Sequence, residues 1–152
     1  MSKVYIIYDT RTGKTEKMAH AIAEGARSIA GVEVVLKKVD NFEPSEVLSL
    51  DGVILGSPTH NTKPSYGMKN FMDKMKQYSF KGKVGSAFGS YGWSGEAVPQ
   101  MIAFLKELGM NVIEPGLRCV GVIDEAKLDK CREFGRDIGR RIIEKVKKGK
   151  ER

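Results

Sequence analysis

Short, continuously apolar runs alternate along this chain with longer segments whose apolar residues recur every third or fourth position. The runs V-Y-I-I-Y (residues 4–8) and V-I-L-G (residues 53–56) are typical of strands buried on both faces of a parallel sheet. In contrast, residues 15–30 repeat their apolar positions at helical spacing. The same pattern predicts strands at residues 3–8, 32–39, 53–56, 83–89 and 111–122, helices at residues 15–30, 66–77, 96–108 and 125–146, and a short helix at 45–49.

Strands and helices that alternate in this way predict an α/β fold with one doubly wound, five-stranded parallel sheet. Right-handed crossovers favour the strand order 2-1-3-4-5, counted along the chain. Glu114-Pro115-Gly116 interrupts the fifth strand, which indicates an edge strand or a bulge. The length of 152 residues fits a single domain, residues 1–152, whose basic end from about residue 147 we expect to be frayed.

Composition narrows the class of protein. Hydrophobic residues make up 41% of the chain, yet no apolar run reaches the roughly 18 residues of a membrane span. The N-terminus enters a strand at once, so we expect no signal peptide and a cytoplasmic location. Cys119 and Cys131 lie far apart without a C-x-x-C motif, which favours two reduced, buried thiols over a zinc site or a redox dithiol. We therefore expect no metal.

The net charge is +7, and much of the excess lies near the C-terminus. No aromatic residues interleave with that basic cluster to stack on bases, so we expect no nucleic-acid partner. A solvated face of the last helix explains the cluster better. An acidic protein partner, attracted by electrostatic steering, stays open as an alternative.

The most informative stretch is Y-D-T-R-T-G-K-T, which joins the first strand to the first helix. The hydroxyls of Thr10, Thr12 and Thr15 can each donate a hydrogen bond to a phosphate oxygen. Gly13 allows a close backbone approach, and Lys14 adds a positive charge. One threonine would fit an ordinary helix cap, but three hydroxyls around a glycine favour a phosphate site at the helix start.

Two further unusual loops follow the third and fourth strands. One is polar and bracketed by prolines, with the candidate ligand contacts Pro58, Thr59, His60 and Asn61. The other is rich in glycine, with the candidates Ser90, Tyr91, Gly92, Trp93 and Gly95. In the order 2-1-3-4-5 these loops converge with the first at the carboxyl edge of the sheet, where ligands bind. A phosphate cradle beside aromatic side chains predicts a phosphorylated planar heterocycle.

The sequence supports a ligand contact more strongly for some of the aromatic candidates than for others. A tryptophan in a glycine-rich loop at a strand end is not expected in the core, so Trp93 or Tyr91 is predicted to stack on the ligand. His60 either lines the ring or lies at the loop surface, and the sequence does not separate the two. The glycines at 89, 92 and 95 have the wrong spacing for a dinucleotide fingerprint.

The motif T-x-T-G-x-T resembles the FMN phosphate loop of the flavodoxin family. The motifs Y-D-T-x-x-x-x-T-E-K-M-A, G-S-P-T-x-N and A-F-G-S-Y-G-W-S-G-E-A more closely resemble the flavodoxin-like domain at the C-terminal end of A-type flavoproteins, the flavodiiron proteins. The resemblance implies non-covalent FMN and electron transfer, with no catalytic side chain. Its phosphate would lie on Thr10, Thr12, Gly13, Lys14 and Thr15, and its ribityl chain and ring on the candidates of the other two loops.

Two departures from the family limit what can be carried over. Only His20 and His60 are present, too few to build a di-iron domain, so oxygen or nitric oxide reduction is not implied. Typical flavodoxins are acidic and this chain is basic, which leaves their usual partners in doubt. The partners implied are a redox protein, either an acidic one or a separate di-iron protein, and a second copy of the chain with FMN near the interface.

We therefore expect an FMN-binding electron-transfer flavoprotein. One alternative is an NAD(P)H-dependent FMN quinone or flavin reductase, although the sequence contains no evident nicotinamide-phosphate site. A second alternative is a flavin-free regulatory or scaffold module, which the three intact loops argue against.

Overall fold

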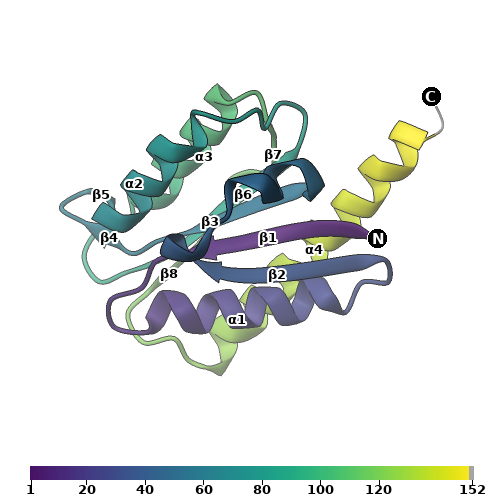
Figure 1. The fold of residues 1–152 in the computed structure, drawn as a ribbon. Coiled ribbons are helices and arrows are strands. Elements are labelled where there is room, and N and C mark those ends of the chain that lie inside the picture. Colours follow the sequence, from purple (N-terminus) through teal and green to yellow (C-terminus); the bar gives the residue numbers. More distant parts are fainter. Residues whose placement is uncertain (151–152) are drawn as a thin grey trace.

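The computed structural model describes residues 1–150 and forms a parallel sheet between two pairs of helices (Figure 1). The strands of the sheet are β1 (Ser2–Tyr8), β2 (Val32–Lys38), β3 (Gly52–Gly56), β6 (Val84–Tyr91), β7 (Asn111–Val112) and β8 (Leu117–Val120). The helices are α1 (Lys14–Arg27), α2 (Tyr66–Met75), α3 (Ala97–Glu107) and α4 (Glu125–Lys150). A two-stranded hairpin, β4 (Thr59–His60) with β5 (Lys63–Pro64), lies outside the main sheet.

The sheet has the order β2-β1-β3-β6-β7, and all of its neighbouring strands are parallel. Counted without the small hairpin, this is the predicted order 2-1-3-4-5. The fifth strand is split as expected: β7 and β8 each pair with β6, and residues 113–116 between them carry Pro115. The doubly wound α/β fold predicted from the sequence is confirmed.

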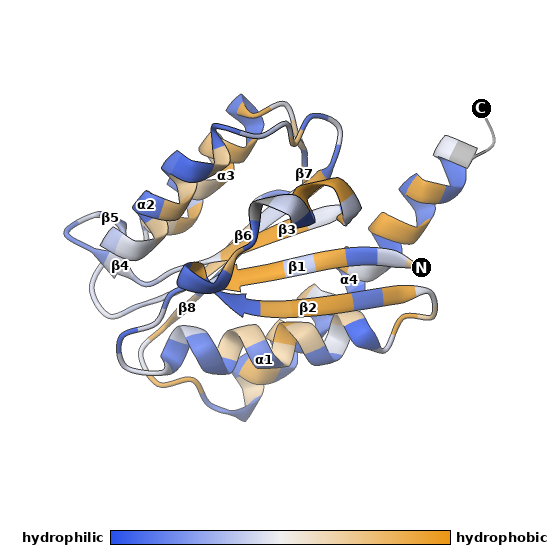
Figure 2. Cartoon of the chain, in the orientation of Figure 1, coloured by the Kyte–Doolittle hydropathy of each residue, from blue (hydrophilic) through white to orange (hydrophobic). Residues whose placement is uncertain are grey.

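Side chains of β1 alternate between the two faces of the sheet, and each face is covered by its own core (Figure 2). Val4, Ile6 and Tyr8 pack with residues of α1 and α4. Tyr5 and Ile7 pack with residues of α2 and α3 on the other face. The helices are orange on one side and blue on the other in Figure 2, as the helical spacing of their apolar residues predicted.

Several boundaries differ from the sequence prediction. α1 ends at Arg27 rather than at residue 30, because Ser28 closes the last turn and its hydroxyl donates to the carbonyl of Gly25. The short helix is a 3-10 helix, Pro44–Ser49. α4 continues to Lys150, so only residues 151–152 of the basic end that was expected to be frayed lie outside the described part. No helix among residues 1–150 is long and apolar enough to cross a membrane.

The two cysteines are buried free thiols, as predicted, but tertiary structure brings them together. Cys119 on β8 and Cys131 on α4 share one core, and their thiols are hydrogen-bonded. Because Cys119 receives this hydrogen bond, its pKa is lowered to about 7, whereas the same bond raises the pKa of Cys131. Because the two cysteines lie on different elements, the sequence alone did not predict their contact.

Candidate functional site

The C-terminal ends of β1, β3 and β6 meet at one edge of the sheet. Their register aligns Tyr8 with Gly56 and Gly56 with Phe88. The three loops singled out in the sequence therefore begin side by side, at the left-hand end of the strands in Figure 1. This is the edge at which doubly wound sheets bind ligands.

The first loop, residues 9–13, is held in shape by its own hydrogen bonds. The Asp9 carboxylate accepts from the Thr10 amide at 3.0 Å and from the Ser65 hydroxyl at 2.6 Å. The Thr10 hydroxyl oxygen in turn accepts from the Gly13 amide at 3.1 Å, which leaves its hydrogen free to donate. Thr12 is exposed at the tip of the loop. The sequence had not identified Asp9 as a residue that shapes the site.

The start of α1 fits a phosphate group. Gly13 is the N-cap residue, and no side chain caps the helix. The amides of the first turn therefore keep their hydrogen-bonding capacity and the positive end of the helix dipole. Gly13 has a φ of +89°, while the space that a Cβ would fill there is empty. Glycine is therefore favoured at position 13 by the left-handed backbone conformation, which it adopts without strain.

Thr15 joins the first loop to the third. Its side chain is buried, and its hydroxyl is hydrogen-bonded to the Ser90 hydroxyl at 2.8 Å. The sequence analysis assigned the Thr15 hydroxyl directly to the phosphate. The structure gives it a second role, because this bond fixes the start of α1 against the end of β6. Lys14, the remaining phosphate candidate, is half-buried.

The second loop contains the hairpin of β4 and β5, which the sequence analysis had treated as an irregular polar loop. Asn61 and Thr62 form its turn with φ values of 50° and 65°. Such left-handed turns are normally marked by glycine, so the sequence carried no strong signal. The hairpin is tied to α3, since the Thr59 hydroxyl oxygen accepts from the Ala97 amide at 3.2 Å and Gln100 donates to the carbonyl of Thr62 at 2.6 Å.

The predicted contacts of this loop are only partly covered. Pro58, Thr59 and His60 are half-buried and Asn61 is exposed. Beneath them the Ser57 hydroxyl donates to the carbonyl of Pro58 at 2.8 Å and accepts from the Ser65 amide at 2.9 Å. The loop therefore stands on a fixed, buried base and keeps its upper side chains accessible.

The third loop is open, and Trp93 is 97% exposed. Tyr91 lies lower in the loop, against Gly95, where a Cβ would come within 3.1 Å of the tyrosine ring. Gly92, by contrast, has open space around it. A hollow of about 340 Å³ lies between this loop and the hairpin, lined by Thr59, Asn61, Thr62, Trp93 and Ser94. Its size is suited to a flat ring.

A carboxylate next to the third loop was not singled out by the sequence analysis. Glu96 follows the third loop, and its buried Oε2 atom has no hydrogen-bond partner among the described residues. A buried oxygen without a donor is costly, so it is a candidate acceptor for a donor on the ligand. Only the tertiary structure reveals that this oxygen is buried.

The arrangement as a whole fits FMN. Free helix amides and hydroxyls gather at one end, and the hollow with its aromatic and polar walls lies at the other. Of the candidates, Thr10, Gly13, Lys14, Thr15 and Ser90 cluster around the start of α1, with Thr12 exposed beside them. Thr59, Asn61 and Trp93 surround the hollow, and Tyr91, Gly92 and Gly95 belong to the loop beside it.

Comparison with known proteins identifies the family of the chain. The family profile described as flavodoxin matches residues 6–135. A flavodoxin of Aquifex aeolicus is 39% identical over 96% of this chain and 88% of its own length. A flavo-diiron protein of Clostridium acetobutylicum is 33% identical over 90% of this chain, which spans only 36% of that relative.

Among solved structures, a flavodoxin from the domain Archaea superposes with a TM-score of 0.88 at 33% identity. The match covers 92% of this chain and 98% of that one. The profile match over most of the sequence and the near full-length relatives show that the chain belongs to the flavodoxin family of FMN-binding electron-transfer proteins.

Proposed function

We propose that this protein is an FMN-dependent electron carrier that exchanges electrons with a partner protein and has no small-molecule substrate of its own. The observation that carries the proposal is the uncapped start of α1 behind Gly13, at the same edge as the hollow beside Trp93. When bound, the flavin supplies the redox chemistry, and the protein supplies orientation and electrostatics.

Each part of the site then has a distinct task. The amides of the first turn of α1 and the hydroxyls of Thr10 and Thr12 bind the phosphate. The hairpin at Thr59 and Asn61 borders one side of the ring, and Trp93 with Tyr91 covers a ring face and excludes water from it. The buried Ser57 hydroxyl, which accepts from the Ser65 amide, keeps the hairpin base fixed.

A visible absorption spectrum of the freshly purified protein tests the proposal. We expect a yellow protein that releases FMN on heating. A colourless protein that also fails to bind added FMN would overturn the proposal and favour the flavin-free regulatory or scaffold module.

The alternative of a reductase is tested on the same preparation. Steady-state assays with NADH or NADPH against a quinone are expected to give only slow, non-saturating turnover. Rapid and saturable turnover would contradict the carrier and make the protein an FMN-dependent quinone or flavin reductase.

The redox partner is proposed to be acidic. Arg11 in the first loop, Lys63 in the hairpin and Lys69 on α2 are exposed, and Lys14 is half-buried at the start of α1. Complementary charge steers a partner most strongly at low salt. The rate of electron transfer to an acidic redox protein should therefore fall as ionic strength rises, and a rate independent of salt would exclude steering by these cations.

A separate di-iron protein is one candidate partner, since this chain resembles part of a flavo-diiron protein.

A further inference from the structure

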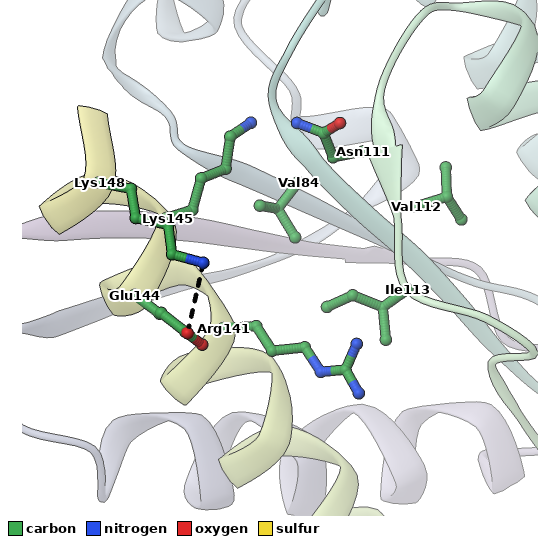
Figure 3. A pocket seen from close by; sticks show the side chains of 8 residues that line it. All are labelled: Val84, Asn111, Val112, Ile113, Arg141, Glu144, Lys145 and Lys148. Atoms are coloured by element: carbon green, nitrogen blue, oxygen red, sulfur yellow. Dashed lines mark ion pairs between the residues drawn. The ribbon is translucent and has the colours of Figure 1, made fainter. Parts of the chain in front are cut away.

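A second hollow, of about 420 Å³, lies at the opposite end of the sheet from the flavin site. Figure 3 shows the side chains that line it. It lies where β6 and β7 begin, between those strands and the last turns of α4. Its apolar side is formed by Val84, Val112 and Ile113. Its helix side is mainly basic and is formed by Arg141, Lys145 and Lys148 together with the carboxylate of Glu144. We refer to this hollow as the basic groove.

The groove exists because α4 is longer than the sheet it covers. The helix packs against α1 along much of its length, and Ile138 and Ile142 anchor it in the core. Its last turns extend past the N-terminal ends of the strands (Figure 1). The starts of β6 and β7 are therefore lined by basic side chains of α4 instead of being closed by an apolar face.

Positive charge exceeds negative charge in the groove. Arg141 is paired with Asp137 at 3.2 Å, and Lys148 with Glu144 at 3.6 Å. Lys145 is half-buried, and within residues 1–150 no carboxylate lies close enough to form an ion pair with its amine. Burial, followed by the nearby amine of Lys83, lowers the pKa of Lys145.

Helix stability alone does not explain these residues. Basic side chains do stabilise the negative end of a helix, but the effect fades within the last turn. Arg141 and Lys145 lie at least a full turn before Lys150, the last helical residue. The repulsion between the partly buried Lys145 and Lys83 is only partly compensated by the nearby Asp51 carboxylate, and an anion in the groove would offset the rest.

We propose that the basic groove binds a small phosphorylated ligand of mononucleotide size. Its volume lies in the range of small-molecule sites. The planar guanidinium of Arg141 and the amine of Lys145 suit phosphate oxygens, while the side formed by Val84, Val112 and Ile113 suits an apolar or aromatic ring. Opposite the helix, Asn111 donates from its amide nitrogen to the carbonyl of Gly82 at 3.1 Å, which leaves its side-chain oxygen as an acceptor.

The test uses the FMN-saturated protein, so that the phosphate loop is already filled, with ADP as the probe. We expect ADP to bind with 1:1 stoichiometry by calorimetry and to shift the amide resonances of Val84, Val112 and Ile113. Arg141→Gln and Lys145→Gln should each weaken binding about tenfold, the effect of losing one charge-assisted contact. Adenosine, which lacks phosphate, should bind far more weakly.

Lys147→Gln is the matched control. Lys147 lies on the same helix but borders a different hollow, with Met1 and Gly31. Its substitution should change ADP affinity less than twofold. Thermal melts and flavin absorption should be unchanged in all three variants. Failure of the ADP prediction would therefore leave the electron-carrier proposal intact.

Several outcomes would overturn the proposal. They are the absence of saturable binding at millimolar ADP, an equal loss of affinity in Lys147→Gln, equal binding of adenosine, and resonance shifts confined to the flavin site.

Discussion

The first and third loops of the flavin site are built in opposite ways. The first, residues 9–13, is fixed by hydrogen bonds from Asp9, Thr10 and Ser65 before any ligand is bound. The third carries Trp93 with 97% of its surface exposed, and within residues 1–150 no hydrogen bond joins Gly92, Trp93 or Ser94 to another residue. The proposed phosphate end is therefore fixed by hydrogen bonds within the protein, whereas the proposed ring end has few such bonds.

This difference has a physical reason. Binding a phosphate requires several donors aimed at one point, and their alignment costs less affinity when folding has already fixed them. Contact with a flat ring depends on area and tolerates small movements. Substitutions in the two loops should therefore separate binding from stability.

The largest effect is expected from Thr12→Asp. A carboxylate beside the bound phosphate adds repulsion of about 2–3 kcal/mol, which weakens FMN binding about 30- to 160-fold. Titration of the apoprotein with FMN, followed by flavin fluorescence, measures this affinity. Gln77→Asp adds the same charge at an exposed position after α2 and is the control. Unchanged affinity in Thr12→Asp would show that the phosphate assignment is wrong.

Trp93→Ala should affect the ring end alone. Stacking between flat rings contributes about 1 kcal/mol, so FMN affinity should fall about fivefold. Because the side chain is exposed, the melting temperature of the apoprotein should hardly change. Calorimetric melts and FMN titrations on one preparation check both effects. A large loss of apoprotein stability would mean that Trp93 has a structural role instead.

Two glycines offer a matched test of pre-organisation. A Cβ would meet no atom within 4 Å at either Gly13 or Gly92, but only Gly13 has a left-handed φ. Gly13→Ala should therefore destabilise the apoprotein by about 1 kcal/mol, and Gly92→Ala by less than about 0.5 kcal/mol. Urea unfolding gives both values. Equal losses would contradict the view that the first loop stores a constraint that the third loop lacks.

The smallest effect concerns Tyr8, the last residue of β1 before the first loop. Burial, followed by the hydrogen bond to Glu16 at 2.9 Å, raises the pKa of Tyr8 to about 12 from an ordinary value of 10.0. Above pH 10 the unfolded chain loses this proton more readily than the folded one, so stability should fall as pH rises from about 10 to 12.

Because the Glu16 side chain is partly exposed, we expect a loss of less than about 1 kcal/mol. Urea unfolding at several pH values measures this loss. Because the pKa of Tyr5 is also raised, the contribution of Tyr8 is isolated by comparing the wild type with Tyr8→Phe. The same pH slope in both proteins would rule out Tyr8 as the source.

Much of the fold and of the candidate site could be predicted from the sequence, because the patterns that indicate them lie in residues close together in the chain. Continuous apolar runs identified the strands, and helical spacing identified the helices that cover them. The strand order followed from handedness rules. That order placed the loops after the first, third and fourth strands at one edge, so most of the candidate site was found from residues close together in the chain.

Other features depend on residues far apart and were decided only by the tertiary structure. Thr15 meets Ser90 across 75 positions, and Cys119 meets Cys131 on another element. The turn at Asn61 and Thr62 carries no glycine signal. The sequence thus determined which segments form strands, helices and ligand loops, because those choices rest on local spacing and backbone preference. Packing decided which side chains meet, because burial and register are properties of the assembled sheet and helices.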